Sequence, residues 1–204
     1  MKTKIAVLVS GGGTNLQALI DAQKSGVLCS GEITLVVSNN ADAYALERAK
    51  NAGISTAVLL KKELGGQAGF EKALAETLEA HGIQVIILAG FMSILSGDFT
   101  KRYPKRILNV HPSLIPAFCG AGFYGLRVHE AALSYGVKVT GATVHLSTRS
   151  RTGERSLPKG RWISCPGIPR NACSGGSWSR RSGSCCPELP SRYAPKSRIR
   201  RNRE

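Results

Sequence analysis

Short apolar runs alternate with amphipathic helix patterns through residues 1–111, and this alternation constrains the fold more than any other feature. Runs rich in β-branched residues, typical of strands, occupy 4–9, 32–38, 56–60, 85–89 and 107–111. Helix patterns follow the glycines at 11–13 and also occupy 43–51 and 70–81. Strands that are separated by helices pair in parallel. The sequence therefore predicts an α/β fold with a doubly wound, mostly parallel sheet.

A glycine-rich loop follows the first predicted strand. Residues 10–15 read Ser-Gly-Gly-Gly-Thr-Asn and lead directly into a helix pattern. Glycine N–H groups at a helix N-terminus form an anion site, to which Thr14 and Asn15 add side-chain donors. The loop lacks the third glycine of a dinucleotide fingerprint and the lysine of a P-loop, which favours a monophosphate over NAD or ATP. The alternative is a tight turn between strand and helix that needs glycines only for steric reasons and binds no ligand.

Asn109 and His111 are two residues apart on the predicted strand 107–111. Alternate strand residues share a face, and open α/β sheets bind ligands at the carboxyl ends of their strands. An amide that can hold a developing oxyanion would then stand beside a proton-handling imidazole. Both residues are therefore candidate catalytic groups. The alternative is that Asn109 caps a turn and His111 is a core histidine.

An apolar loop follows the strand pattern over 85–89. It contains Met92, Ser93, Ile94 and Leu95. At a strand end, such a loop could support a flat heteroaromatic ring against exposed backbone, which makes it a candidate cofactor site. The alternative is that its methionine and aromatic residues belong to the core.

Four segments match a known family in order and spacing, namely 10–17, 88–95, 109–116 and, more weakly, 140–145. Through them the chain resembles phosphoribosylglycinamide formyltransferases, the folate-dependent enzymes of purine (IMP) biosynthesis, over about residues 4–145. The resemblance implies a Rossmann-like formyltransferase catalytic domain over 1–146. It also implies formyl transfer from 10-formyltetrahydrofolate to the amine of glycinamide ribonucleotide. The implied partners are these small molecules, without a metal, a nucleic acid or a membrane.

The resemblance also implies roles for individual residues. Those that it places on the ribose phosphate are Gly13, Thr14 and Asn15. Those that it places around the pterin of the folate are Met92, Ser93, Ile94, Leu95 and Asn109. Asn109 and His111 are the implied catalytic pair at the formyl group. Asn109 would donate to the oxyanion, and His111 would help to stabilise it and manage protons.

Two departures from the family pattern bear on activity. Gln67 stands where the family usually has an arginine that contacts folate, so that contact is not carried over. The family's supporting carboxylate lies in an Asp-Gly-Gly turn shortly after the segment 140–145. Here the matching positions are Thr152, Gly153 and Glu154. The chain as written lacks the family's catalytic aspartate, which predicts impaired activity.

The composition changes at the same place. Residues 147–204 hold 14 of the 28 lysines and arginines but only 3 of the 13 acidic residues, and they show no hydrophobic period. Such a segment cannot bury a core, so it is predicted to be an unstructured, poorly ordered basic tail. We interpret it as an out-of-frame translation. In the shifted frame, each codon consists of the last base of one residue's codon and the first two bases of the next. Read in this frame, the codons of residues 151–154 can encode Asp-Gly-Gly, and those of residues 173–187 can encode an amphipathic helix.

Other functions are possible for the tail and for the enzyme. The tail carries Trp162, Trp178 and Tyr193 and could bind nucleic acid, although its charge is scattered rather than set along one face. Its cysteines do not keep zinc-ligand spacing. Within enzymes, the alternatives are another folate-dependent formyltransferase or a formyltetrahydrofolate hydrolase. The sequence shows no signal peptide or long apolar segment, which predicts a cytoplasmic protein with free thiols.

Overall fold

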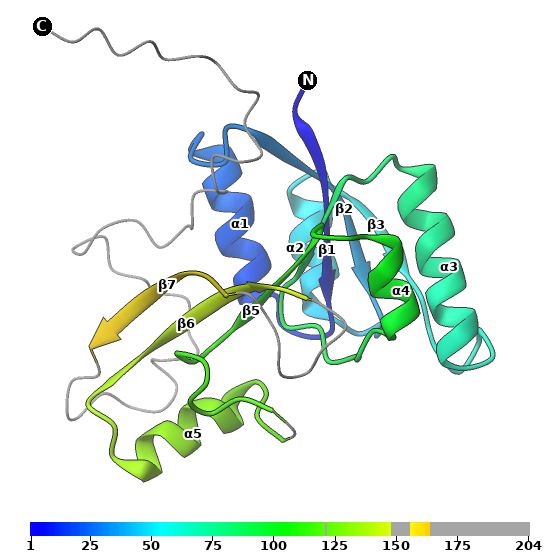
Figure 1. Cartoon of the computed structure of the whole chain (residues 1–204). Coiled ribbons are helices and arrows are strands. Elements are labelled where there is room, and N and C mark those ends of the chain that lie inside the picture. The colour runs from blue at the N-terminus through cyan, green and yellow to red at the C-terminus, as the bar shows by residue number, and fades with distance from the viewer. Residues whose placement is uncertain (121, 148–155, 164–204) are drawn as a thin grey trace, which may run out of the picture.

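The computed structural model describes residues 1–120, 122–147 and 156–163, the last of these by its backbone path only. One sheet is flanked by helices on both faces (Figure 1). Its strands are β1 (Thr3–Val9), β2 (Gly31–Ser38), β3 (Ser55–Val58), β4 (Val85–Leu88), β5 (Ile107–His111), β6 (Val139–Leu146) and β7 (Ser156–Ile163). The helices are α1 (Thr14–Lys24), α2 (Tyr44–Asn51), α3 (Gln67–Ala80), α4 (Gly97–Arg102) and α5 (Leu126–Tyr135).

The seven strands are ordered β3-β2-β1-β4-β5-β6-β7. Strands β1 to β5 pair in parallel, whereas β6 is antiparallel to β5 and β7 is antiparallel to β6. The chain begins at β1, moves outward to β3, and then crosses to β4 on the other side of β1. This reversal is the hallmark of a doubly wound sheet. The predicted α/β fold with a mostly parallel sheet is confirmed.

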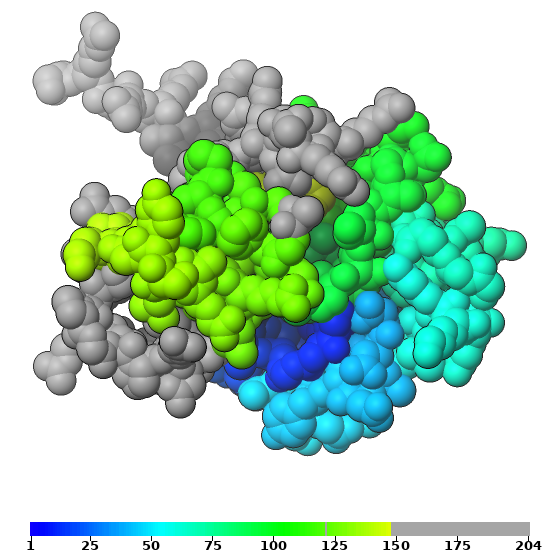
Figure 2. Space-filling view, turned by 90° about the horizontal axis from the view of Figure 1, so that it is seen from below, coloured from blue at the N-terminus to red at the C-terminus, as the bar shows by residue number. Residues whose placement is uncertain are grey.

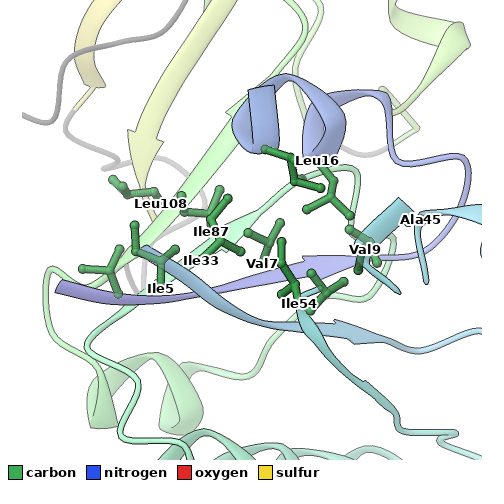
Figure 3. Close-up of a cluster of buried hydrophobic side chains, with 14 residues drawn as sticks. Ile5, Val7, Val9, Leu16, Ile33, Ala45, Ile54, Ile87 and Leu108 are labelled. Carbon is green, nitrogen blue, oxygen red and sulfur yellow. The ribbon is translucent and has the colours of Figure 1, made fainter. Parts of the chain in front are cut away.

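The apolar core lies on both faces of the sheet. One cluster packs between the sheet and helices α1 and α2, and Figure 3 shows it in close-up. A second cluster packs between the sheet and helices α3 and α4. Strand β1 contributes Ile5, Val7 and Val9 to the first cluster, and Ala6 and Leu8 to the second. Because side chains alternate between faces, a strand covered on both sides is apolar at successive positions.

The structure contains α4, α5 and β6, which the sequence patterns did not predict. Helix α5 fully buries only Val128 and Ala132, so its apolar stripe is too narrow to mark a helix. The buried positions of β6 are Gly141, Thr143 and His145. Its inner face is small and polar, and a hydrophobic period of two therefore does not appear in the sequence.

Strand β7 lies within the segment 147–204, for which the sequence predicts no regular structure. Its backbone pairs with β6 from Val139 opposite Ile163 to His145 opposite Ser156. Strand pairing uses main-chain N–H and C=O groups, which the outer edge of β6 offers whatever the side chains of its partner. This explains how a strand forms where the sequence carries no hydrophobic pattern. Residues 148–155 and 164–204 lie outside the described residues.

Candidate active site

Three loops leave the sheet at one edge. The aligned registers place Leu8 of β1 beside Leu88 of β4, and Leu88 beside Asn109 of β5. The glycine loop, the loop 90–95 and the end of β5 therefore lie at the carboxyl edge. The order of the strands reverses between β1 and β4, which is where open α/β sheets form their ligand crevice. Figure 2 looks onto this edge and shows the blue N-terminal segment between the green and light-blue segments.

A cavity of about 210 Å³ lies at the reversal point, lined by residues 10–15, Ala89, Gly90 and Met92. The N–H of Met92 donates to Ser10 Oγ at 2.8 Å and so ties its two walls together. The loop residues predicted to bind phosphate all belong to the lining, namely Gly13, Thr14 and Asn15. Asn109 and His111 are not part of this lining. They lie at the same edge, on the far side of β4.

Gly13 is required at the start of α1 for two reasons. Its φ is 72°, in the left-handed region, and a Cβ at this position would lie 2.6 Å from Ala45 Cβ of α2. Only glycine accepts both the conformation and the close approach. No side chain caps α1 at Gly13, which leaves the first N–H groups of the helix available to a ligand, and Thr14 and Asn15 line the cavity beside them. This arrangement suits an anion.

The loop predicted to hold the folate has a mixed character. Met92 and Ile94 are 55% and 75% exposed, which is unusual for large apolar side chains and suits contact with a flat ring. Ser93 Oγ is buried, and Leu95 packs against the core cluster under α3 and α4. Gln67 Nε2 donates to the Ile94 carbonyl at 3.0 Å. Gln67 thus holds the loop in place from α3.

Asn109 contacts His145, a residue to which the sequence analysis gave no role. The two residues are partners across β5 and β6, and Asn109 Nδ2 lies 3.1 Å from His145 Nε2. An amide nitrogen can only donate, so His145 accepts at Nε2 and its ring is neutral. Burial lowers the pKa of His145, and the nearby His111 also lowers it, which favours the neutral form. The amide of Asn109 has a second N–H with which to bind a ligand.

His111 is anchored through the loop that follows β5. Its Nε2 lies 2.9 Å from the carbonyl oxygen of Phe118. A carbonyl oxygen can only accept, so Nε2 carries the proton and the neutral ring has its lone pair on Nδ1. The loop therefore fixes the tautomer, and Nδ1 is the atom that can take up a proton.

A buried hydroxyl of β6 holds the same loop. Thr143 Oγ1 donates to the carbonyl oxygen of Ser113 at 2.7 Å and accepts from the N–H of Ile115 at 3.0 Å. Thr143 and Ser113 are both buried. Sequence reasoning missed the roles of Thr143 and His145. The signal that could have found them is their spacing of two residues within the segment 140–145, opposite the polar pair of β5.

Possible metal ligands, free cysteines and helices long enough to span a membrane also bear on what the described residues can do. The described residues contain no group of His, Cys, Asp and Glu that could hold a metal ion, and their two cysteines, Cys29 and Cys119, are free thiols. Within the described ranges, no helix combines the length and the apolar character needed to cross a membrane. Thr152, Gly153, Glu154 and the cysteines of the tail lie outside the described residues.

The sequence matches the formyl transferase family over residues 3–150, well over half of the chain. The chain belongs to this family. The phosphoribosylglycinamide formyltransferase of Escherichia coli (strain K12) is 41% identical over 149 residues, which are 73% of this chain and 68% of that protein. The trifunctional purine biosynthetic protein adenosine-3 of Gallus gallus is 48% identical over 144 residues, which are 71% of this chain and 14% of that protein. The chain thus spans a small part of the trifunctional relative and about two thirds of the bacterial one.

Solved structures show the same formyl transferase fold. Glycinamide ribonucleotide transformylase 1 from Symbiobacterium toebii superimposes with a TM-score of 0.76 at 37% identity, over 84% of this chain and 78% of that chain. A formyltetrahydrofolate deformylase from Pseudomonas syringae has a TM-score of 0.72 at 20% identity, which shows a shared fold alone. Proteins named for different reactions share the fold, so the reaction of this formyl transferase must be argued from its site.

Proposed function

We propose that this formyl transferase transfers a formyl group from 10-formyltetrahydrofolate to the amine of glycinamide ribonucleotide, a step of purine (IMP) biosynthesis in the cytoplasm. The observation that carries the proposal is that an anion-binding glycine loop and the pair Asn109 and His111 leave one edge of the sheet. The relatives from Escherichia coli and Symbiobacterium toebii support it, since both are named for this substrate.

The glycine loop is the proposed site of the nucleotide phosphate. The N–H groups at the start of α1 and the side chains of Thr14 and Asn15 can donate to phosphate oxygens, while Gly13 lets the loop approach α2. The cavity of about 210 Å³ has room for a phosphate and part of a ribose, but not for a dinucleotide. A small phosphorylated acceptor fits this site better than a transfer RNA, whose recognition needs an extended surface.

The loop after β4 is the proposed site of the folate pterin, through Met92, Ser93, Ile94 and Leu95, with Asn109 at its inner end. The exposed side chains of Met92 and Ile94 supply apolar surface for the ring. Asn109 lies beside Leu88, the last residue of β4, and so stands between the pterin loop and β6. The formyl group of the folate would then meet the amide of Asn109.

The reaction follows from the two polar side chains. The glycinamide amine attacks the formyl carbon, a new C–N bond forms, and the formyl oxygen becomes an oxyanion. Asn109 stabilises this oxyanion with the N–H that His145 leaves unused. The intermediate collapses as the bond to folate N10 breaks. His111 Nδ1 accepts the proton of the attacking amine and delivers it to N10, so charge is balanced and no metal is required.

We also propose that residues 147–204 are an out-of-frame tail. The family match ends at residue 150, close to the change in composition at 147. The family's aspartate would support His111, and the chain as written offers Thr152, Gly153 and Glu154 at those positions. The proposal therefore assigns weak transfer activity to the chain as written and full activity to a version restored to the alternative frame after His145.

An acceptor comparison tests the proposed function. The frame-restored protein is mixed with 10-formyltetrahydrofolate and either glycinamide ribonucleotide, initiator methionyl-tRNA or buffer alone, and release of tetrahydrofolate is followed. We expect release with glycinamide ribonucleotide to exceed the other two by on the order of a hundredfold, as positioning of the acceptor demands. Equal release in buffer alone would identify a hydrolase. Release that is fastest with the transfer RNA would identify a different formyltransferase.

A further inference from the structure

We infer that Arg48 of α2 is a positioning residue that shapes the phosphate-binding loop, an inference that rests on the proposed function. Arg48 Nε donates to the carbonyl oxygen of Gly12 at 2.9 Å, and Nη1 donates to Gln17 Oε1 at 3.1 Å. The guanidinium also lies over the ring of Tyr44, with 5.0 Å from Cζ to the ring centroid. Arg48 is thus fixed between α2 and the start of α1, directly behind the glycine loop.

Helix α2 holds two successive carbonyl groups of the loop. The N–H of Ala45 donates to the carbonyl oxygen of Gly11 at 3.0 Å, and Arg48 binds that of Gly12. In a trans peptide unit, the N–H points opposite to the carbonyl of the preceding residue. The N–H groups of Gly12 and Gly13 therefore point away from α2. Among the described residues, no hydrogen bond uses either of these N–H groups.

The topology places the cavity on the side to which these N–H groups point. Helix α2 follows β2, which lies on one side of β1. The opposite wall of the cavity, Ala89 and Gly90, follows β4 on the other side of β1. Groups directed away from α2 thus face the cavity. Successive N–H groups that converge on one concavity form an anion-binding nest.

Arg48 acts on this nest from behind rather than as a phosphate ligand. It is absent from the lining of the cavity, whereas Gly12 and Gly13 belong to it. A peptide unit between two glycines can rotate at little cost, because neither residue has a Cβ to oppose the change. Without an anchor on the Gly12 carbonyl, the Gly13 N–H would spend part of its time turned away from the cavity. Arg48 prevents this rotation.

The test measures the dissociation constants of ribose 5-phosphate and of ribose for the full chain, by calorimetry. Arg48→Met removes the anchor and should weaken ribose 5-phosphate binding about tenfold, the effect of losing one charge-assisted hydrogen bond. Arg48→Gln places an amide nitrogen as many bonds from Cβ as the arginine Nε, so it can still donate to Gly12 without the charge. It should stay within about threefold of the unaltered chain.

Lys50→Met is the matched control. It removes the same charge from the same helix, but the Lys50 side chain is 59% exposed, and its ion pair within the described residues is with Glu47 of the same helix at 2.9 Å. It should leave both dissociation constants unchanged. Circular dichroism checks that each variant is folded. If Arg48→Met does not fold, Arg48→Lys, which keeps the charge but loses the donor at the Nε position, should show the weaker phosphate binding.

Each other outcome has a distinct meaning. Equal affinities in Arg48→Met and Lys50→Met would overturn the positioning role. Affinities of Arg48→Gln as low as those of Arg48→Met would also overturn it, because charge rather than the carbonyl anchor would then matter. If the unaltered chain binds ribose 5-phosphate no better than ribose, the proposed function itself fails. In the frame-restored enzyme, Arg48→Met should raise KM for glycinamide ribonucleotide while leaving KM for the folate and kcat unchanged.

Discussion

The two halves of the candidate site are supported by different parts of the chain. The glycine loop, which is the proposed phosphate half, is held by α1, by α2 and by the N–H of Met92, that is, by residues between 10 and 92. Asn109 and His111, which are the proposed chemical half, depend instead on β6. Asn109 contacts His145, 36 residues later, and Thr143 holds the loop after His111. The phosphate half is therefore complete well before residue 147, where the composition changes, whereas the chemical half adjoins that change. A change in the sequence after residue 147 should therefore impair formyl transfer but leave phosphate binding intact.

The largest expected effect comes from restoring the alternative frame after His145. If the proposed frame is correct, the restored protein regains the family's Asp-Gly-Gly turn, and formyl transfer should rise by on the order of a hundredfold, the usual contribution of a positioned acid-base group. Affinity for ribose 5-phosphate should be the same in both proteins, because the glycine loop is untouched. Single-turnover transfer and calorimetry measure the two quantities. Comparable transfer rates would show that the tail is a functional terminus and that the frame interpretation is wrong.

Replacing His111 by alanine should break the chemical half alone. In the frame-restored protein, His111→Ala removes the atom Nδ1 that is proposed to take up the proton of the attacking amine, and kcat should fall on the order of a hundredfold. Asn109→Ala should act similarly by removing the oxyanion donor. Both variants should bind ribose 5-phosphate normally, and His111→Ala should also bind folate normally. Unchanged turnover in either variant would remove that residue from the mechanism.

The sequence predicted the strands that bury apolar side chains, but not β6 and β7. Strands β1, β2, β4 and β5 bury apolar residues, so their hydrophobic patterns predicted them, whereas β3 has no fully buried residue. Strand β6 buries Gly141, Thr143 and His145, and its pattern is therefore invisible to a hydrophobic period. Strand β7 pairs through its backbone, which no side-chain pattern records.

The site shows a similar limit. The period of two predicted that Asn109 and His111 share a strand end, and the glycines predicted a turn before α1. The sequence could not predict that His145 would accept from Asn109, because that contact depends on the register of an antiparallel pair. It could not predict the role of Arg48 either, because a helix residue that binds a loop carbonyl leaves no periodic signal. Contacts between distant segments require the topology.

Replacing Gly13 by alanine should break the phosphate half alone, with a smaller effect. The added Cβ would lie 2.6 Å from Ala45 Cβ, at a φ of +72°. Gly26→Ala is the control, since Gly26 has a φ of +78° with open space around it and meets only the left-handed penalty of about 1–2 kcal/mol. We expect Gly13→Ala to weaken ribose 5-phosphate binding about tenfold and Gly26→Ala to leave it unchanged. Equal binding by the two variants would mean that contact with α2 does not shape the loop.

The smallest expected effect is a pH dependence of stability that originates in the chemical half. Burial lowers the pKa of His145 below its ordinary value of 6.5. Above that value, the ring is neutral in both the folded and the unfolded chain, and its contribution to stability is at its maximum. As the pH falls from 6.5 toward the lowered native pKa, His145 becomes protonated in the unfolded chain but stays neutral in the folded chain. The free energy of unfolding must then decrease over this window.

Melting temperatures measured from about pH 8 to about pH 5 should reveal this decrease, which spans the ordinary range of histidine titration. His145→Gln cannot titrate and keeps an acceptor for Asn109, so its melting temperature should fall less steeply in acid. Burial also lowers the pKa of His129 in α5, which adds a decrease of the same sign. His129→Gln therefore serves as the comparison and should flatten the profile without affecting transfer. If His145→Gln keeps the full acid slope while His129→Gln removes it, the neutral ring of His145 is not what acid disrupts.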